Sequence, residues 1–271
     1  MYQLIASVNL TSCAWAPPTE KGGIVWVRTM DAARHLLENG LCEWPIVAPR
    51  AGGECPISKP DGWPVDRFSV IRPAWAGETV VCIAGGPSVA DIDLEAIRGK
   101  ARFIAINNSY LIAPWADLLY FADYRWWEWH RDRPEFKSFA GAKVTIQGTG
   151  SLVPDTSTHL LHNYGTDGLS EVPNGLHTGC NSGYQAINIA YLAGARRIIL
   201  LGYDMRFRNG RSHWHLGHPL RNPELHYEMY AKLFGSTRKQ LDAAGIEVFN
   251  CCLDSHINAF PRRALAGLLP D

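Results

Sequence analysis

Short, strongly apolar segments alternate with helical segments between residues 79 and 250, and this alternation restricts the fold more than any other feature of the chain. The first segment, TVVCIA at 79–84, is apolar and rich in β-branched residues, as in a strand that is buried on both faces. Strands that alternate with helices predict a mostly parallel sheet covered by helices. We therefore expect an α/β fold.

The same pattern continues to the C-terminal part of the chain, and it predicts a Rossmann-like domain over residues 74–271. We expect strands at 79–84, 102–106, 118–121, 143–147, 197–201 and 246–250. We expect one helix that contains 91–97 and two further helices at 183–193 and 227–244.

Residues 1–73 have a different character. They predict strands at 2–10 and 24–28 and a short helix at 31–39. The stretch that follows, 44–64, holds five Pro and three Gly in 21 residues, which excludes a regular element. We expect a small α+β accessory module and linker ahead of the catalytic domain.

Composition excludes several classes of protein. Lys and Arg number 26 against 26 Asp and Glu, so the chain lacks the basic excess of proteins that coat nucleic acids, although a local basic patch stays open. Seven cysteines without CxxC or metal-type spacing predict reduced thiols and a cytoplasmic location. No apolar run approaches the roughly 18 residues of a membrane span. The sequence leaves a homo-oligomer open.

Polar residues recur just after the expected strands. Because the carboxyl ends of parallel strands meet at one sheet edge, where ligands bind in open α/β sheets, these residues predict one shared site. The alternative is that each is a helix cap or a turn residue. The residues are Ser88, Asn107, Asp123, Asp204 and Ser255.

Two glycine-containing loops precede expected helices. Gly85, Gly86, Pro87 and Ser88 follow the first strand, and this turn allows close approach of the backbone to an anion such as phosphate. The turn matches neither GxGxxG nor a Walker A sequence. The second loop, TGCNSG at 178–183, supplies Asn181 and Ser182 as donors or, in the alternative interpretation, caps the helix.

Three of the ten histidines lie within six residues of one loop, at positions 213, 215 and 218. Histidine is the usual side chain for proton transfer near neutral pH, so we favour a catalytic or binding role over a metal site or an inert loop. Four tryptophans lie between Trp115 and His130, and we expect them in the core or in an oligomer contact rather than stacked on a ligand.

Short motifs follow one another in order between 79 and 265: IAGGPSVADID, AINNSY, FADY, CNSGYQAINIAYLAGARRIILLGYDM, SHWHLGH and VFNCCLDSHINAF. Through them this region, about two thirds of the chain, resembles the bacterial sialyltransferases of glycosyltransferase family 42. It is more broadly similar to the DUF115 group, which contains motility-associated glycosylation factors and an archaeal pterin pyrophosphokinase.

The resemblance implies a nucleotide-sugar donor of CMP type, a hydroxyl acceptor and no required metal. It implies that the turn at 85–88 approaches the nucleotide, that Asp123 lies near the donor sugar and that His213 is the general base. It further implies nucleotide contacts for Asn107, Ser182 and Gly183.

The sequence departs from the family at two places. Gly85 stands where the family has an asparagine that reads cytosine, which leaves the donor base open. The family's two tyrosines that hold the leaving phosphate are absent from the corresponding stretch, MRFRNGRSH. We expect an arginine to replace them, since guanidinium groups bind phosphate well, and the candidates are Arg206, Arg208 or Arg211.

We therefore expect a nucleotide-dependent transferase, with a metal-independent, sialyltransferase-like glycosyltransferase as the leading hypothesis. The first alternative is a pyrophosphokinase that uses ATP and Mg²⁺ through Asp123 and Asp204. The second is a nucleotide-binding or structural module whose chemistry has lapsed.

Overall fold

The computed structural model describes residues 2–6, 24–27, 42–43, 55–58, 68–147, 157–215 and 224–270. The chain divides into two compact units, residues 1–48 with 64–66 and residues 49–63 with 67–271. In the first unit, the described strands form an antiparallel sheet of order β2-β1-β3. They are β1 Tyr2–Ala6, β2 Ile24–Val27 and β3 Cys42–Glu43. The expected helix at 31–39 lies outside the described residues, and the expected domain boundary at 73 stays a prediction.

The second unit contains an eight-stranded sheet in which every neighbouring pair is parallel. This confirms the predicted α/β, Rossmann-like class. A separate antiparallel pair, β4 Ile57–Ser58 and β5 Val70–Ile71, belongs to the same unit. The eight strands are β6 Thr79–Ile83, β7 Arg102–Ile106, β8 Leu118–Phe121, β9 Ala142–Ile146, β10 His159–Gly165, β11 Gly175–His177, β12 Arg197–Leu201 and β13 Glu247–Asn250.

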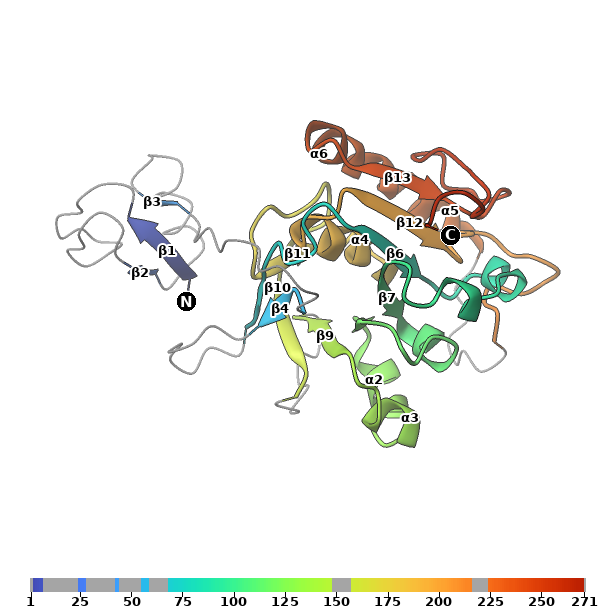
Figure 1. Ribbon diagram of the computed structural model, residues 1–271, viewed down its shortest axis with the longest axis horizontal. Helices are drawn as coiled ribbons and strands as arrows, with labels where there is room; N and C mark the ends of the chain where they lie inside the picture. Colours follow the sequence, from blue (N-terminus) through green and yellow to red (C-terminus); the bar gives the residue numbers. More distant parts are fainter. Residues whose placement is uncertain are drawn as a thin grey trace. The chain divides into compact units, whose positions relative to one another are not determined.

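Strand order reverses at β6. The order is β11-β10-β9-β8-β7-β6-β12-β13, so the chain builds outward from β6 on one side and then returns to build on its other side (Figure 1). The connection after β6 therefore leads to β7 on one side of the sheet, and the connection after β12 leads to β13 on the other side. Such a switch point opens a crevice at the carboxyl ends of the strands, where α/β sheets bind ligands.

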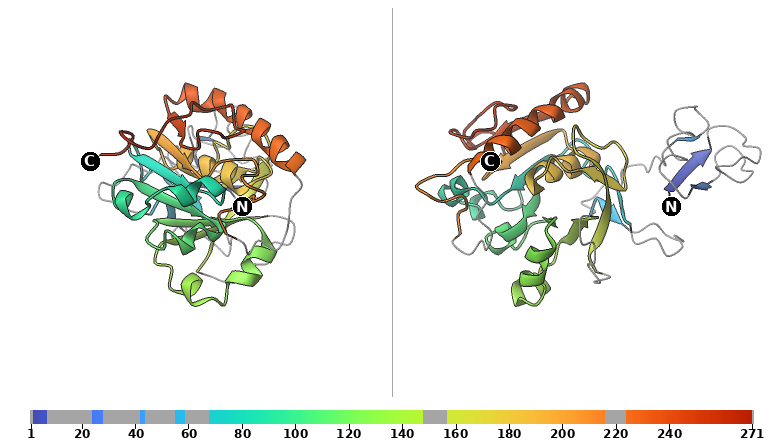
Figure 2. Two further views of the ribbon diagram at one scale, coloured as in Figure 1. Left: turned by 90° about the vertical axis from the view of Figure 1, so that its right-hand side faces the viewer. Right: turned by 180° about the vertical axis from the view of Figure 1, so that it is seen from behind.

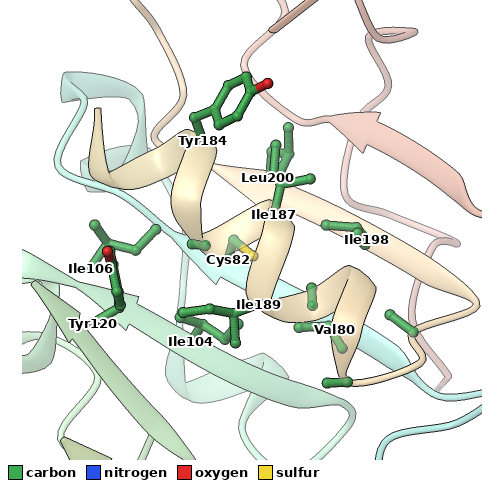
Figure 3. Close-up of a cluster of buried hydrophobic side chains, with 14 of the residues drawn as sticks. Val80, Cys82, Ile104, Ile106, Tyr120, Tyr184, Ile187, Ile189, Ile198 and Leu200 are labelled. Carbon is green, nitrogen blue, oxygen red and sulfur yellow. The ribbon is translucent and has the colours of Figure 1, made fainter. Parts of the chain in front are cut away.

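Both faces of this sheet are buried. One face packs against α4 Ser182–Leu192, whose Ile187 and Ile189 lie over β6, β7 and β12 (Figure 3). The same cluster includes side chains from α5 Glu224–Leu233 and α6 Arg238–Ala243. Residues that alternate with these in the strands point to the opposite face, which explains why the strands are apolar throughout.

The opposite face carries a cluster rich in aromatic side chains, contributed by α2 Tyr124–His130 and α3 Pro134–Lys137. Figure 2 shows these helices in green, well apart from α5 and α6 in orange and red. Trp126 and Trp127 are both 3% exposed, which confirms the prediction that they lie in the core. Trp129, in contrast, is 41% exposed.

Two predicted helices are wrong in their detail. The segment after Ser88 forms two 3-10 turns, η1 Pro87–Asp91 and η2 Glu95–Ile97, because Ile92 between them is extended. The expected helix at 227–244 is divided by η4 Phe234–Thr237, where side-chain hydroxyls bond to nearby carbonyls and tighten the turn.

Strands β10 and β11 are absent from the prediction. In β10 only Leu161 is buried, and β11 has three residues, so neither shows the continuous apolar run of the central strands. In the described part of the chain, no helix is both long and apolar enough to cross a membrane.

One histidine lies inside the aromatic cluster. His130 is 3% exposed, stacks on Trp126 with ring centroids 4.1 Å apart, and shares a hydrogen bond of 2.8 Å with the Tyr110 hydroxyl. Burial, followed by the positive charges of Arg133 and His215, lowers the pKa of His130 to about 4. His130 is therefore neutral in the folded protein at physiological pH.

We expect the stability of the protein to fall as the pH drops from about 6.5 to about 4, because the unfolded chain protonates His130 and the folded chain does not. The loss of stability at the lower end is about 3 kcal/mol, because the pKa falls from 6.5 to about 4 and each unit corresponds to about 1.4 kcal/mol. Urea unfolding at several pH values measures it. The variant His130→Phe should reduce the dependence of the unfolding free energy on pH. The variant His226→Gln, at an exposed position, should leave this dependence unchanged. Equal slopes in the wild type and in His130→Phe would contradict this assignment.

Candidate functional site

Hydrogen bonds join the two loops of the switch point. The Gly86 amide donates to the Gly202 carbonyl over 2.9 Å. The Ser88 amide and hydroxyl donate to the two carboxylate oxygens of Asp204 over 3.0 Å and 2.7 Å. Ser88 and Asp204 thus contact each other directly although they are 116 positions apart, and a shared ligand site for them stays a prediction.

Position 86 requires a glycine because the two loops approach each other so closely there. A Cβ atom at position 86 would lie 2.1 Å from Oδ2 of Asp204 and 2.3 Å from the Gly202 carbonyl oxygen. Asp204 itself is 1% exposed, and burial raises its pKa, while the hydrogen bonds from Ser88 oppose that rise. Asp204 therefore holds the glycine turn in place, and its carboxylate is occupied by the protein.

The histidine loop lies on the glycine turn. The Trp214 amide donates to the Gly85 carbonyl over 3.0 Å, and Cδ2 of His213 lies 3.0 Å from the position of a Cβ at Gly85. Nδ1 of His213 shares a hydrogen bond of 2.9 Å with the Ser212 hydroxyl. The His215 ring is 5.3 Å from that of His213, and residue 218 lies outside the described residues. Histidine is thus present where a ligand would meet the turn.

The arginines of this loop have different partners. Arg208 and Arg211 pair through their backbones across a turn in which Asn209 and Gly210 have positive φ. The Arg208 side chain pairs with Asp91, and Arg206 bonds to the carbonyl of Asp254 over 3.2 Å. The exposed side chain of Arg211 has no hydrogen bond or ion pair within the described ranges. Arg211 is therefore the arginine that is free to bind a phosphate.

Asn107 follows β7 directly and has an uncommon backbone conformation. Its φ is 51°, in the left-handed region that few residues other than glycine adopt readily. Its Oδ1 is buried and, among the described residues, has no hydrogen-bond partner. A buried acceptor without a donor costs free energy, so such an atom often marks a position where a ligand supplies the donor.

The second glycine-containing loop begins α4. Asn181 caps this helix: its Oδ1 accepts from the Tyr184 amide over 2.9 Å. Gly183 is needed for packing, since a Cβ there would lie 2.9 Å from the ring of Tyr203. The half-buried Ser182 keeps its hydroxyl free of hydrogen bonds in the part of the chain described. Of these three candidate residues, Ser182 is the one whose side chain is available to bond to a ligand.

Ser255 and Asp123 already have structural partners. The Ser255 hydroxyl donates to the Tyr203 carbonyl over 2.6 Å and accepts from the Ile257 amide over 3.0 Å. It is 2% exposed. Asp123 is exposed and caps α2 by accepting from the Arg125 amide over 2.8 Å. Their predicted ligand contacts stay predictions, and Asp123 has the more accessible side chain.

Asp204 also belongs to a group of potential metal ligands that the sequence did not indicate as a group. Ligand atoms of Asp204, Cys252 and Asp254 lie within 4.8 Å of one another. Burial raises the pKa of the Cys252 thiol to about 12, and the thiol donates to Asp254 over 3.2 Å. Mg²⁺ prefers oxygen ligands, and both oxygens of Asp204 accept from Ser88. These residues do not fit the magnesium site that the pyrophosphokinase alternative requires.

Comparisons with known proteins give one structural likeness. No protein-family model and no curated protein matches the chain. Among solved structures, the chain is similar to the structure of MAf glycosyltransferase from Magnetospirillum magneticum AMB-1, with 15% sequence identity and a TM-score of 0.44. The match covers 71% of this chain and 34% of that chain, so this chain spans about a third of that protein's length. The resemblance to glycosyltransferase family 42 and the DUF115 group stays a prediction from motifs.

Proposed function

We propose that the chain is a nucleotide-dependent transferase, specifically a sialyltransferase-like glycosyltransferase with a nucleotide-sugar donor and a hydroxyl acceptor. The observation that carries the proposal is the hydrogen bond from the Trp214 amide to the Gly85 carbonyl. It sets His213 against the glycine turn of the switch point, where an α/β sheet binds its ligand. The contact between a histidine loop and a glycine turn at this edge supports a base and a phosphate-binding turn in one site.

In the proposed reaction, the acceptor hydroxyl oxygen attacks the anomeric carbon of the donor sugar. The bond from that carbon to the phosphate oxygen breaks, and the nucleotide leaves with the bonding electron pair. The hydroxyl proton passes to the imidazole of His213. The exposed Arg211 guanidinium supplies positive charge for the leaving phosphate, in the role that tyrosines have in family 42.

The pyrophosphokinase is the weaker candidate because its two proposed magnesium ligands lie in different environments. Asp204 is buried under Ser88, whereas Asp123 is exposed and caps α2. The lapsed module is a separate alternative, in which nucleotide binding persists without turnover.

The proposal includes a cytoplasmic location. The five described cysteines are free thiols, which supports it: Cys55, Cys82, Cys180, Cys251 and Cys252.

A thermal-shift series with CMP, CDP, UDP, GDP and ATP, with and without Mg²⁺, tests the proposal. A nucleotide at about 100 times its Kd should stabilise the protein by about 2.7 kcal/mol and raise Tm by roughly 5 to 10 °C. Asn107→Gly should reduce this shift, because it removes the buried Oδ1 acceptor. The Tm of the free variant should stay equal or rise, since glycine relieves the positive φ.

Asn209→Gly is the matched control. Asn209 has a φ of 52° in an exposed turn, so this variant relieves the same backbone strain without removing a buried acceptor. An Asn107→Gly variant with the full nucleotide shift would remove Asn107 from the site. A shift that requires ATP and Mg²⁺ together would favour the pyrophosphokinase. If no nucleotide changes Tm, both enzyme hypotheses are contradicted.

A further inference from the structure

A pocket with several charged side chains in its lining lies between α5 and the loop that follows β13. Its volume is about 780 Å³, within the range of pockets that bind small molecules. It shares Asp254, Ser255 and His256 with the loop that contacts Asp204, since the His256 amide donates to the Asp204 carbonyl over 2.9 Å. The pocket is therefore connected to the switch point through the backbone.

Cationic side chains reach this pocket from three separate elements. Arg206 comes from the loop after β12, Lys232 from α5, and Arg262 from the C-terminal segment. Two carboxylates, Glu228 and Asp254, also line it. Three cations against two anions leave one excess positive charge.

The charges are not equivalent, because one carboxylate is already paired. The Asp254 carboxylate lies 3.5 Å from the Arg206 guanidinium, and a hydrogen bond from Cys252, followed by the charges of Arg206 and Arg208, lowers its pKa. Lys232 has no hydrogen bond or ion pair within the described ranges. The positive charge available to a ligand is therefore that of Lys232 and Arg262, opposed by Glu228.

Both guanidinium groups are held in place before any ligand binds. Nη1 of Arg206 donates to the Asp254 carbonyl over 3.2 Å, and Nη2 of Arg262 donates to Oδ1 of Asn258 over 2.6 Å. Each group keeps further N–H donors, because a guanidinium carries five. Side chains that are already oriented lose less conformational entropy when a ligand binds.

We propose that this pocket binds the phosphate group of a hydroxylated small molecule. Donors that converge from three directions suit the several oxygens of a tetrahedral phosphate better than a planar carboxylate. The pocket exceeds the size of a phosphate alone, and Glu228 and Asn258 offer acceptors for hydroxyl groups. Two sources share this chemistry: the nucleotide of the donor, or a phosphorylated sugar that serves as acceptor. The inference rests on the proposed function for its place in the reaction but not for the binding itself.

Calorimetry on the full chain, with glucose 6-phosphate, CMP, UDP and uncharged glucose as probes, tests the pocket. Lys232→Gln and Arg262→Gln should each weaken binding of the phosphate-bearing probe by at least about tenfold, because each removes a charge-assisted hydrogen bond. Lys239→Gln, which removes an exposed lysine of α6 that does not line the pocket, should leave it unchanged. Melting curves verify that each variant is folded.

Each outcome decides the proposal. Binding of glucose 6-phosphate that depends on Lys232 and Arg262 supports it with a sugar phosphate as the source, and equal dependence for CMP or UDP supports it with the nucleotide as the source. Phosphate probes that bind equally to all variants, or that do not bind at all, overturn it. Failure here is distinct from failure of the proposed function: if nucleotide binding responds to Asn107→Gly while no phosphate probe, glucose 6-phosphate included, responds to Lys232→Gln, the pocket alone is removed. Glucose 6-phosphate binding without any nucleotide shift removes the transferase and retains the pocket.

Discussion

His213→Gln is expected to lower turnover by about 10²- to 10⁴-fold while nucleotide binding stays within about twofold. Glutamine keeps a polar side chain of similar reach, but it cannot accept the proton of an acceptor hydroxyl near neutral pH. The measurement is release of free nucleotide from the donor sugar nucleotide that the thermal-shift series identifies, with and without acceptor.

The control for this variant is His226→Gln, which removes an exposed histidine of α5 and should leave turnover unchanged. Because His213 rests on Gly85 and bonds to Ser212, the melting temperature of His213→Gln must also be measured. A variant that is folded, binds nucleotide and keeps full turnover would exclude His213 as the general base. Loss of nucleotide binding with retained turnover per bound donor would assign it a binding role instead.

Gly86→Ala should produce the largest loss of stability among single-methyl changes in the glycine turn. The added Cβ would meet both a side-chain oxygen of Asp204 and the backbone oxygen of Gly202, at 2.1 Å and 2.3 Å. The backbone oxygen cannot rotate away, so β6 and β12 must separate at their carboxyl ends or the Ser88 contacts to Asp204 must break. We expect a cost of about 3 kcal/mol or more and a decrease in Tm of roughly 6 to 12 °C.

Gly235→Ala is the matched change at a glycine with open space, since no atom from elsewhere in the described part of the chain lies within 4 Å of its added Cβ and its φ is not positive. It should be neutral or raise stability by up to about 1 kcal/mol, because alanine reduces the entropy of the unfolded chain. Thermal and urea unfolding of both variants give the comparison. Equal stability of Gly86→Ala and the wild type would show that the two loops do not approach as closely as described.

The strands of the sheet centre were predictable because their burial on both faces leaves a local signal. The residues of β6 and β12 are almost all apolar, so each strand is visible without knowledge of its neighbours. Strand β10, which lies next to the edge strand β11, has no such signal, because only Leu161 of its seven residues is buried. The helix expected after Ser88 is two 3-10 turns instead, because Ile92 between them is extended.

The site was predictable as a set of positions and not as a set of contacts. Parallel topology brings every strand's carboxyl end to one edge, so Ser88 and Asp204 could be assigned to that edge from their places in the chain. That Ser88 occupies both oxygens of Asp204 could not be foreseen, because it depends on how closely β6 and β12 approach. Nor could the sequence foresee that the Ser255 hydroxyl donates to the Tyr203 carbonyl; its expected ligand contact stays a prediction.

The amino-acid sequence by itself determined the α/β class, the glycine turn and the concentration of histidines near position 213, since each depends on local composition and spacing. The tertiary structure decided which of these groups meet. It set His213 on Gly85, left Oδ1 of Asn107 buried without a partner among the described residues, and brought Arg206, Lys232 and Arg262 to one pocket. The physical reason is that hydrogen bonds and charge pairs act over a few ångströms between residues distant in the chain, and packing of the whole sheet fixes those distances.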